Sequence, residues 1–258
     1  MIHDDFDPRR VANTTDALAG RVIAITGATG GYGRALALDC AKHGAEVILI
    51  GRNVKKLEAL HAEIVAAQRG DGRATPEPVI APLDLEKAIA KDFDTLADAI
   101  AARFGRLDGL VHNAAMLGEV SPIAHQDVPT WVRVMHVNVT APFALTQVLL
   151  PQLLASKDGS IVCVASAVGR RARAYWGAYA VSKHALEGFA GVLADELENT
   201  DVRVNTLNPG RMRTAMRRAA YPSEDAATLP TPDVATGACI ALLGAAARGV
   251  TGGRFDAQ

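Results

Sequence analysis

The sequence has few of the residues and spacings that define metal-binding or disulfide-rich proteins. Its 258 residues include three cysteines and seven histidines, and aromatic residues make up 5%. Cys40, Cys163 and Cys239 each lie among apolar residues without disulfide or ligand spacing, which predicts buried free thiols in a reducing compartment. The histidines show no ligand spacing either, so we expect no metal site, and we expect His112, at a strand end, to be a satisfied core residue.

The sequence also lacks an excess of charge and a long apolar run. The net charge is −1, whereas a general nucleic-acid binder needs a surplus of Lys and Arg to release counterions. The first twenty residues are polar and acidic and contain no apolar core of a secretory signal. No apolar run reaches the roughly 18 residues of a membrane span. These absences predict a cytoplasmic protein with neither a nucleic-acid nor a membrane partner.

Apolar residues are plentiful, at 49%, and they are mostly Ala, Val, Leu and Ile. Short apolar runs alternate with longer amphipathic or Ala-rich stretches, which is typical of parallel strands joined by crossover helices. The pattern predicts an α/β fold: a three-layer, Rossmann-like, doubly wound parallel sheet of about seven strands with helices on both faces. We expect an N-terminal extension, residues 1–19, and a single domain, residues 20–258.

The alternation gives a position for each expected element. The expected strands are Arg21–Thr26, Glu46–Ile50, Pro78–Leu83, Gly109–Asn113, Ser160–Ala165, Arg203–Leu207 and Gly253–Phe255. The expected helices are Tyr32–His43, Val54–Gln68, Ala88–Phe104, Pro129–Leu154, Tyr179–Glu198 and Pro232–Ala247. Two polar stretches with prolines interrupt the order, at Gly70–Pro78 and Arg211–Pro232. The second follows the carboxyl end of a strand, where open α/β sheets bind ligands, so it is a candidate lid.

A glycine-rich turn directly follows the first expected strand. It reads Thr26-Gly27-Ala28-Thr29-Gly30-Gly31-Tyr32-Gly33 and leads into an Ala- and Leu-rich helix. Glycines let the backbone turn tightly and approach a pyrophosphate, and the helix N-terminus offers free N–H groups and a partial positive charge. Methyltransferases and simple tight turns also use such glycines, but the position between an N-terminal strand and a helix favours dinucleotide binding.

The tip of the second strand bears on the choice of cofactor. In a dinucleotide-binding fold this tip meets the adenosine ribose, where an acidic residue would bond the ribose hydroxyls. The sequence has Gly51-Arg52-Asn53 instead, with no Asp or Glu. Arg52 would attract a 2′-phosphate, which favours NADP(H) over NAD(H). If Arg52 is only a solvated surface cation, the choice stays open.

Four polar residues at fixed separations predict catalysis: Asn138, Ser166, Tyr179 and Lys183. Tyr179 and Lys183 are i, i+4 neighbours on one face of a helix. A phenol has a pKa near ~10 and exchanges protons poorly at neutral pH. We therefore expect the ammonium of Lys183 to lower the pKa of Tyr179 and make it a general acid/base. Ser182 would point off this face, so we expect it to pack.

Together these motifs resemble the short-chain dehydrogenase/reductase family from about Gly20 onward. Thr26–Gly33 has that family's Thr-Gly-x-x-x-Gly-x-Gly form. Three further motifs are similar to family motifs: Asp84-Leu85 to the pair that contacts adenine, Asn113-Ala114-Ala115 to the Asn-Ala-Gly turn, and Pro209-Gly210 with Thr214 to the turn facing the nicotinamide. Ala115 replaces the usual glycine and would be strained if its φ were positive. The chain most resembles poorly characterised bacterial, cytoplasmic oxidoreductases.

The resemblance implies hydride transfer between a nicotinamide cofactor, for which Arg52 favours NADP(H), and a carbonyl compound or secondary alcohol. It implies a tetrad in which Tyr179 exchanges the proton, Lys183 lowers the pKa of Tyr179 and holds the nicotinamide ribose, Ser166 binds the substrate oxygen, and Asn138 holds a water. The cofactor-binding residues it implies are Gly27, Thr29, Gly31, Tyr32, Gly33, Arg52, Asp84, Leu85, Asn113, Ala114, Tyr179, Lys183, Pro209, Gly210 and Thr214. Two alternatives stay open, with Ser166 as a turn former and Asn138 as a backbone partner in a helix kink.

The substrate and the partners are less defined. Seven arginines lie in the two segments expected to flank the cleft: Arg170, Arg171, Arg173, Arg211, Arg213, Arg217 and Arg218. They indicate either an anionic substrate such as an acyl thioester, attracted by charge, or only solvated loops. The helix Ala178–Glu198 is apolar on more than one face, which suits a homodimer or homotetramer. Two other functions stay open: a catalytically silent cofactor-binding regulator or scaffold on the same fold, and an S-adenosylmethionine-dependent methyltransferase.

Overall fold

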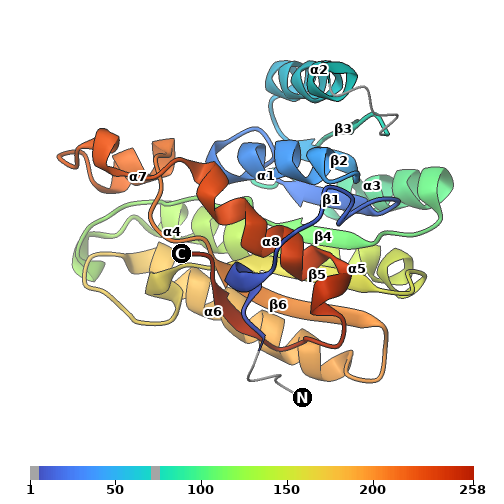
Figure 1. The fold of residues 1–258 in the computed structure, drawn as a ribbon. Coiled ribbons are helices and arrows are strands. Elements are labelled where there is room, and N and C mark those ends of the chain that lie inside the picture. Colours follow the sequence, from blue (N-terminus) through green and yellow to red (C-terminus); the bar gives the residue numbers. More distant parts are fainter. Residues whose placement is uncertain (1–5, 71–75) are drawn as a thin grey trace.

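The computed structural model describes residues 6–70 and 76–258, and a single parallel sheet runs through these residues (Figure 1). Its strands are β1 (Val22–Thr26), β2 (Glu46–Gly51), β3 (Val79–Pro82), β4 (Gly109–His112), β5 (Gly159–Val164), β6 (Val202–Asn208) and β7 (Arg254–Asp256). Their order is β3-β2-β1-β4-β5-β6-β7, and every neighbouring pair is parallel. The predicted doubly wound α/β fold is confirmed. The expected connection Gly70–Pro78 lies partly outside the described residues.

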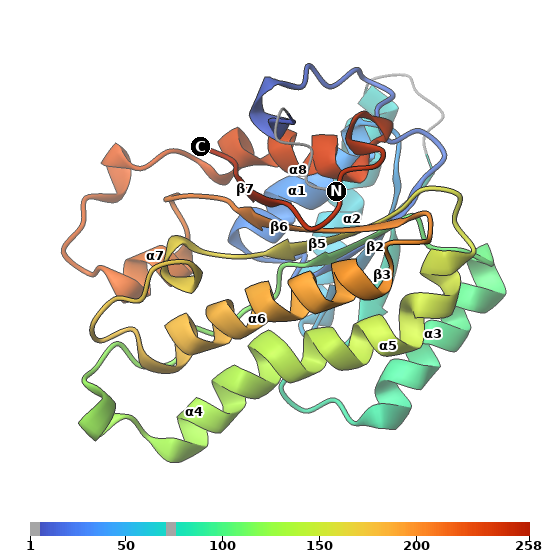
Figure 2. The ribbon, with the colours of Figure 1, turned by 90° about the horizontal axis from the view of Figure 1, so that it is seen from below.

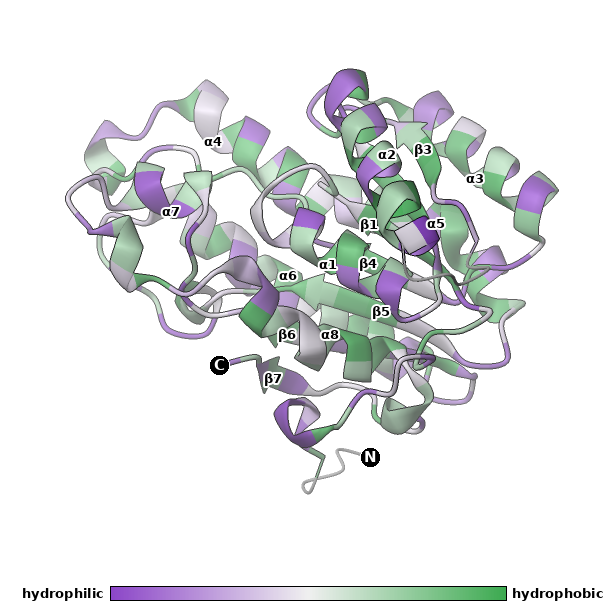
Figure 3. Ribbon diagram, turned by 45° about the horizontal axis from the view of Figure 1, so that its top comes forward, coloured by the Kyte–Doolittle hydropathy of each residue, from purple (hydrophilic) through white to green (hydrophobic). Residues whose placement is uncertain are grey.

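Helices cover both faces of the sheet (Figure 2). The helices are α1 (Gly31–Lys42), α2 (Val54–Gly70), α3 (Ala90–Phe104), α4 (Val128–Met135), α5 (Ala141–Leu154), α6 (Gly177–Glu196), α7 (Ala215–Ala220) and α8 (Thr236–Leu243). Buried residues of α1, α2 and α8 form one core with the sheet, and those of α3, α5 and α6 form the core on its other face. Hydrophobic and hydrophilic residues alternate along α3, as an amphipathic helix at the surface requires (Figure 3).

The expected single helix Pro129–Leu154 is interrupted in the structure. A π-helical turn, His136–Thr140, separates α4 from α5. The cause lies in the sequence, because Pro142 in the first turn of α5 has no N–H to donate to the carbonyl of Asn138, four residues earlier. The expected helix Pro232–Ala247 is also divided, because α8 ends at Leu243 and Gly244 adopts an extended backbone with φ of −88° and ψ of 178°.

Two stretches are more apolar than the sequence analysis allowed. Val128–Leu154 and Ala226–Leu243 are each long and apolar enough to cross a membrane by length and composition alone. The expectation that no stretch reaches this length is therefore wrong. In the structure, however, α5 and α8 supply buried residues to the two cores. A helix that is buried in the core of a covered sheet can pass the same test of length and composition.

The residues before β1 pack on the α8 side of the sheet. Leu18 is fully buried in that core, and the Asn13 amide donates a hydrogen bond of 2.8 Å to the carbonyl of Gly237. The division into an extension, 1–19, and a domain, 20–258, stays a prediction. The strand order reverses between β1 and β4, so the carboxyl ends of these two strands are where a doubly wound sheet binds ligands.

Candidate active site

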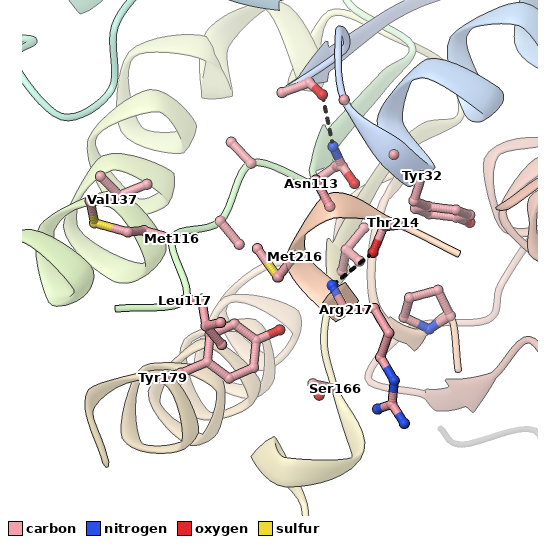
Figure 4. A pocket seen from close by; sticks show the side chains of 18 of the residues that line it. Tyr32, Asn113, Met116, Leu117, Val137, Ser166, Tyr179, Thr214, Met216 and Arg217 are labelled. Atoms are coloured by element: carbon pink, nitrogen blue, oxygen red, sulfur yellow. Dashed lines mark hydrogen bonds between the residues drawn. The ribbon is translucent and has the colours of Figure 1, made fainter. Parts of the chain in front are cut away.

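A cavity of about 490 Å³ lies at the carboxyl ends of the central strands (Figure 4). This volume is in the range of small-molecule sites. All predicted site residues line the cavity except Gly33 and Asn138. Several lining residues were not predicted from the sequence: Glu86, Met116, Leu117, Val137, Met212 and Met216. Met116 and Leu117 follow the Asn113 turn directly, which is the only sequence signal that indicated them.

The glycine turn forms one end of the cavity. Gly27 and Gly31 have φ of +65° and +44°, a backbone conformation that favours glycine. Helix α1 begins at Gly31, so its first free N–H groups face this end of the site. A Cβ atom at Gly33 would overlap the side-chain amide of Asn113 and the carbonyl of Gly27. Gly33 therefore shapes the turn from behind, without lining the cavity.

Asn113 fixes the turn after β4 to the turn after β1. Its amide donates to the carbonyls of Thr26 at 2.8 Å and Gly27 at 3.2 Å. In return the Thr26 hydroxyl accepts the backbone N–H groups of Asn113 and Ala114, each at 3.0 Å. Among the described non-glycine residues only Tyr175 has a positive φ, so Ala115 carries none of the strain that was considered for it.

Arg52 lies at the tip of β2, beside the cavity. Its side chain is 69% exposed, and its guanidinium lies 3.3 Å from the carboxylate of Glu86, which also lines the cavity. Glu86 is 3.6 Å from Arg133 as well. The guanidinium is thus held by a partly exposed ion pair, which is weak and which an anion can displace.

Tyr32 lines the cavity, but its hydroxyl is directed away from the centre. The Tyr32 hydroxyl donates a hydrogen bond of 3.1 Å to the carbonyl of Ala235. This bond joins the first turn of α1 to the short 3-10 helix Pro232–Ala235. The predicted Tyr32 therefore has an anchoring contact within the protein.

Tyr179, Ser166 and Lys183 converge at the opposite end of the cavity. Tyr179 and Lys183 lie one turn apart on α6, and Ser166 follows β5. The phenol of Tyr179 projects into the cavity, with Ser166 beside it (Figure 4). The Lys183 amine is buried, lies 5.8 Å from the centre of the Tyr179 ring, and donates a hydrogen bond of 2.6 Å to the carbonyl of Val164.

Burial dominates the electrostatics of this group. It raises the pKa of Tyr179 above its ordinary value, while the hydrogen bond with Ser166 acts in the opposite direction. Burial also lowers the pKa of Lys183 to about 8. The expected lowering of the Tyr179 pKa by Lys183 is therefore wrong: burial raises this pKa, and the Lys183 amine donates to the carbonyl of Val164.

Asn138 lies behind the cavity, in the π-helical turn. Its side-chain oxygen accepts the N–H of Met116 at 2.7 Å, and its amide donates to the Met116 carbonyl and to the Ser182 hydroxyl, each at 2.9 Å. Ser182 in turn donates to the carbonyl of Tyr179 at 2.8 Å. The Asn138 side chain thus forms hydrogen bonds with the backbone of Met116, as expected from the alternative in which it is a backbone partner in a helix kink. Ser182 connects Asn138 to α6 and so does more than pack.

Apolar and aromatic side chains line the cavity around Tyr179. Val168, Tyr179 and Ala180 form a small core with Ala115, Leu117, Trp176 and Met216 packed against it. The Trp176 ring centre lies 5.8 Å from that of Tyr179 and 5.7 Å from that of Tyr221 in the lid. The lid thus packs on the loop before α6, next to the phenol.

Most of the seven arginines bind other parts of the protein. Arg170 pairs with Glu187 and Asp256, and Arg213 donates to the carbonyl of Leu229. Arg173, in the loop before α6, donates to the Tyr221 hydroxyl of the lid at 2.7 Å. Within the lid, Arg217 makes two bonds of 2.6 Å to Glu224 and lies 3.7 Å over the Tyr221 ring. Arg211 and Arg217 line the cavity.

His112, behind the site, has a hydrogen-bond partner for only one of its two ring nitrogens among the described residues. It is 2% exposed, and its Nε2 lies 2.8 Å from the Thr146 hydroxyl, but its Nδ1 has no partner among the residues that the structure describes. Burial lowers the pKa of His112 to about 3. The expectation of a satisfied core residue is thus wrong for one of its nitrogens. All three cysteines are free and buried, as predicted.

This pKa predicts a loss of stability in mild acid. Below its unfolded pKa near ~6.5, His112 binds a proton in the unfolded chain but not in the folded one, so stability falls as pH falls. Between pH 7.5 and 5 the loss from this group should be about 2 kcal/mol. Urea unfolding of the wild type and His112→Asn measures it: the wild type should lose more stability than the variant over this range. Parallel losses would contradict the prediction.

The sequence model of the short chain dehydrogenase family matches residues 21–225. The chain belongs to this family. It is 46% identical over 243 residues to YciK of Escherichia coli K12, described as an uncharacterized oxidoreductase, and the match covers 94% of each protein.

Solved structures of this family are similar along almost the whole chain. A short chain dehydrogenase from Salmonella enterica serovar Typhi is 47% identical with a TM-score of 0.91, and the match covers 95% of this chain and 98% of that one. One from E. coli CFT073, complexed with NADPH, is 47% identical with a TM-score of 0.90, covering 95% and 99%. One from Shigella flexneri 2a, complexed with NADP, is 45% identical with a TM-score of 0.90, covering 95% and 100%. This short-chain dehydrogenase is therefore an oxidoreductase of CH–OH and C=O groups.

Proposed function

We propose that this short-chain dehydrogenase uses NADP(H) to interconvert a carbonyl compound and its secondary alcohol. One observation carries the proposal: a single cavity has a glycine turn and Arg52 at one end and the convergent side chains of Tyr179, Ser166 and Lys183 at the other. A methyltransferase would have no use for the second group. A phosphate-binding turn within one cavity of a proton donor suits a cofactor that carries the redox chemistry itself.

The residues present fit NADP(H). Gly27, Gly30 and Gly31 of the glycine turn line the cavity, and the first N–H groups of α1 would hold the pyrophosphate. Arg52 would bind the 2′-phosphate, Asp84 and Leu85 would contact the adenine, and Pro209-Gly210 with Thr214 would face the nicotinamide. The relatives from E. coli and Shigella that were crystallised with NADPH and NADP support this assignment. When bound, the nicotinamide would supply or accept the hydride.

The chain's own residues would manage the proton and orient the substrate. Tyr179 would donate its phenolic proton to the carbonyl oxygen, or accept one from the alcohol in the reverse direction. The raised pKa of Tyr179 keeps the phenol protonated, which is the form that carbonyl reduction requires. Ser166 would donate to the same oxygen and fix its distance. Lys183, whose amine lies 5.8 Å from the centre of the Tyr179 ring, would hold the ribose hydroxyls.

We propose that Asn138 supports a proton path through its backbone. Its side chain is already bonded to Met116 and Ser182, whereas its carbonyl receives no bond from the imino nitrogen of Pro142. That carbonyl would hold the water that reconnects the catalytic group to solvent. The side chain of Asn138 then acts by position, since it joins the Met116 segment to α6.

A panel of carbonyl compounds assayed with NADPH and with NADH tests the proposal. The panel should contain neutral aromatic and aliphatic ketones together with acetoacetyl-CoA. Oxidation of NADPH that depends on a carbonyl compound, at a higher kcat/KM than with NADH, supports the proposal. Binding of NADPH without turnover of any member would favour a silent regulator or scaffold. An absence of NADPH binding would refute both.

The substrate of 3-oxoacyl thioester type remains a second candidate, because Arg211 lines the cavity and is exposed. The other observations favour a neutral substrate. The phenol is surrounded by apolar side chains, and Arg170, Arg173 and Arg217 are bonded within the protein. Preferred turnover of acetoacetyl-CoA over neutral ketones in the same panel would reverse this order.

Substitution of Arg52 should weaken NADPH binding selectively. The guanidinium would face the 2′-phosphate that only NADP(H) carries, and its exposure limits the effect to about tenfold in Kd. Fluorescence titration of Arg52→Ala should therefore show a weaker Kd for NADPH and an unchanged Kd for NADH. The control Arg10→Ala removes an exposed arginine in the N-terminal segment and should change neither. An equal loss for both cofactors would show that Arg52 does not select the phosphate.

We further propose a cytoplasmic homodimer or homotetramer. Apolar side chains remain exposed along the outer faces of α5 and α6, with Phe143, Val181 and Val192 exposed by 49%, 43% and 60%. Such side chains suit burial against a second copy of the chain. Light scattering of the purified protein measures its mass, and a mass of 27.1 kDa would identify a monomer and contradict the proposal.

A further inference from the structure

The segment after β7 lies against the turn that leads into the lid. Asn208, at the end of β6, is in register with Asp256 in β7. The Asn208 amide donates to the Asp256 carboxylate at 2.7 Å, and the Ala257 N–H donates to the Asn208 carbonyl at 2.9 Å. The side-chain oxygen of Asn208 also accepts the N–H of Gly210 at 3.2 Å. The turn and the segment after β7 are therefore one bonded unit.

Gln258 makes the most direct contact with this turn. Its side-chain amide donates to the carbonyls of Pro209 at 2.8 Å and of Arg211 at 3.1 Å. These two carbonyls flank Gly210, which has a φ of +81°. A Cβ atom at Gly210 would lie 2.7 Å from the Gln258 side chain. The carboxamide has two N–H donors, and both carbonyls are within its reach, so it holds the turn from both sides.

The same turn borders the cavity. Asn208, Pro209, Gly210, Arg211 and Met212 all line it. In a trans peptide the C=O and N–H groups point in opposite directions. Holding the Arg211 carbonyl toward Gln258 therefore turns the N–H of the same peptide group, that of Met212, to the other side. The position of one side chain thus sets the direction of a backbone donor beside the cavity.

A second set of hydrogen bonds connects this segment to the loop that follows Ser166. Arg170, in the loop that follows Ser166, donates to the Asp256 carboxylate at 3.1 Å and to the Phe255 carbonyl at 2.9 Å. Arg170 also pairs with the buried carboxylate of Glu187 on α6 at 2.9 Å. The segment that carries Gln258 is therefore fixed to the body of the protein, which allows Gln258 to constrain the turn.

We propose that Gln258 is a positioning residue for the nicotinamide end of the cofactor site. The inference rests on the proposed function, in which Pro209-Gly210 faces the nicotinamide. Without its two bonds to Gln258, the turn would occupy several conformations, and a cofactor that needs one of them would bind more weakly in proportion to the population lost. Gln258 would act only through the turn, so the adenosine end should be unaffected.

Two ligands distinguish the ends of the site in the cofactor-free full chain. NADPH spans both ends and is titrated by its fluorescence, whereas adenosine 2′,5′-bisphosphate lacks the nicotinamide and is titrated by calorimetry. We expect Gln258→Ala to raise the Kd of NADPH about three- to tenfold, the range for one or two lost hydrogen bonds. The Kd of the bisphosphate should stay unchanged. Gln258→Glu keeps the shape of the side chain, but an ionised carboxylate has no N–H to donate. We therefore expect Gln258→Glu to raise the Kd of NADPH at least as much as Gln258→Ala does.

The control is Gln147→Ala, which removes an exposed glutamine on α5 and should change neither Kd. An unchanged Kd of NADPH in both Gln258 variants, or equal losses for the two ligands, would overturn the inference even if the melting temperature falls. Failure of the wild-type chain to bind NADPH at all is a different result, since it would refute the proposed function together with this inference.

Discussion

Tyr179→Phe is expected to lower kcat for carbonyl reduction by about 10²–10⁴-fold, the contribution of a positioned general acid. The substitution removes only the hydroxyl. The ring keeps its contact with Trp176 and its place in the small core beside Ala180. NADPH binding should therefore change little. The measurements are steady-state kcat on the best ketone of the panel and the Kd of NADPH by fluorescence titration.

Tyr175→Phe is the matched control for this substitution. Tyr175 lies in the loop just before α6, four residues before Tyr179, but it is 60% exposed and no lysine follows it after four residues. Loss of the Tyr175 hydroxyl should leave kcat within about twofold of the wild-type value, as for a surface substitution. A Tyr179→Phe enzyme that retains nearly full kcat would contradict the assignment of Tyr179 as the acid. Unchanged turnover would also move the proton donor to another group of the cavity.

Asp158→Ala is expected to lower the free energy of unfolding by about 3–5 kcal/mol, the cost of removing one partner of a buried ion pair. Asp158 binds Arg21 at 2.9 Å and Arg203 at 3.0 Å, and the Arg203 side chain is only 5% exposed. Arg203 would keep its bonds to the carbonyls of Leu242 and Ala247, but its charge would have no buried counter-ion. Urea unfolding followed by circular dichroism measures the change.

The location of this cluster makes the test specific. Asp158 directly precedes β5 and Arg203 lies near the start of β6, so both are at the end of the sheet opposite to the cavity. The folded variant should therefore bind NADPH with the wild-type Kd. The control Asp195→Ala removes an exposed carboxylate on α6 and should change the unfolding free energy by less than about 0.5 kcal/mol. A similar small change for Asp158→Ala would mean that Arg203 needs no counter-ion.

The sequence was sufficient for the sheet and for the ends of its strands. Alternation of apolar runs located every strand, because a parallel sheet that is buried on both faces needs continuous apolar residues. Motifs at the strand ends indicated most of the cavity lining, since turns with special backbone angles restrict the residue type, as at Gly27 and Gly31. The break in the expected long helix was also present in the sequence at Pro142, but its π-helical form depends on packing.

Contacts between segments far apart in the chain could not be predicted from the sequence. The spacing of Tyr179 and Lys183 predicted that they share a helix face, but not that the amine would bond to Val164 or that burial would raise the pKa of Tyr179. Both results depend on the surrounding structure, which spacing does not encode. In the same way, seven arginines read as a basic patch, because no pattern showed that Arg170 meets Glu187 and Asp256.

The aromatic contact between the candidate lid and the loop before α6 has a kinetic consequence. The Tyr221 ring centre lies 5.7 Å from that of Trp176 and 3.7 Å from the Arg217 guanidinium, and Thr214, just before α7, lies close to Gly31 of the glycine turn. Outward movement of α7 must separate these surfaces before a bulky molecule passes. We therefore expect these contacts, which lie outside the reacting atoms, to slow the exchange of reactants and products with solvent, because dissociation steps can limit turnover.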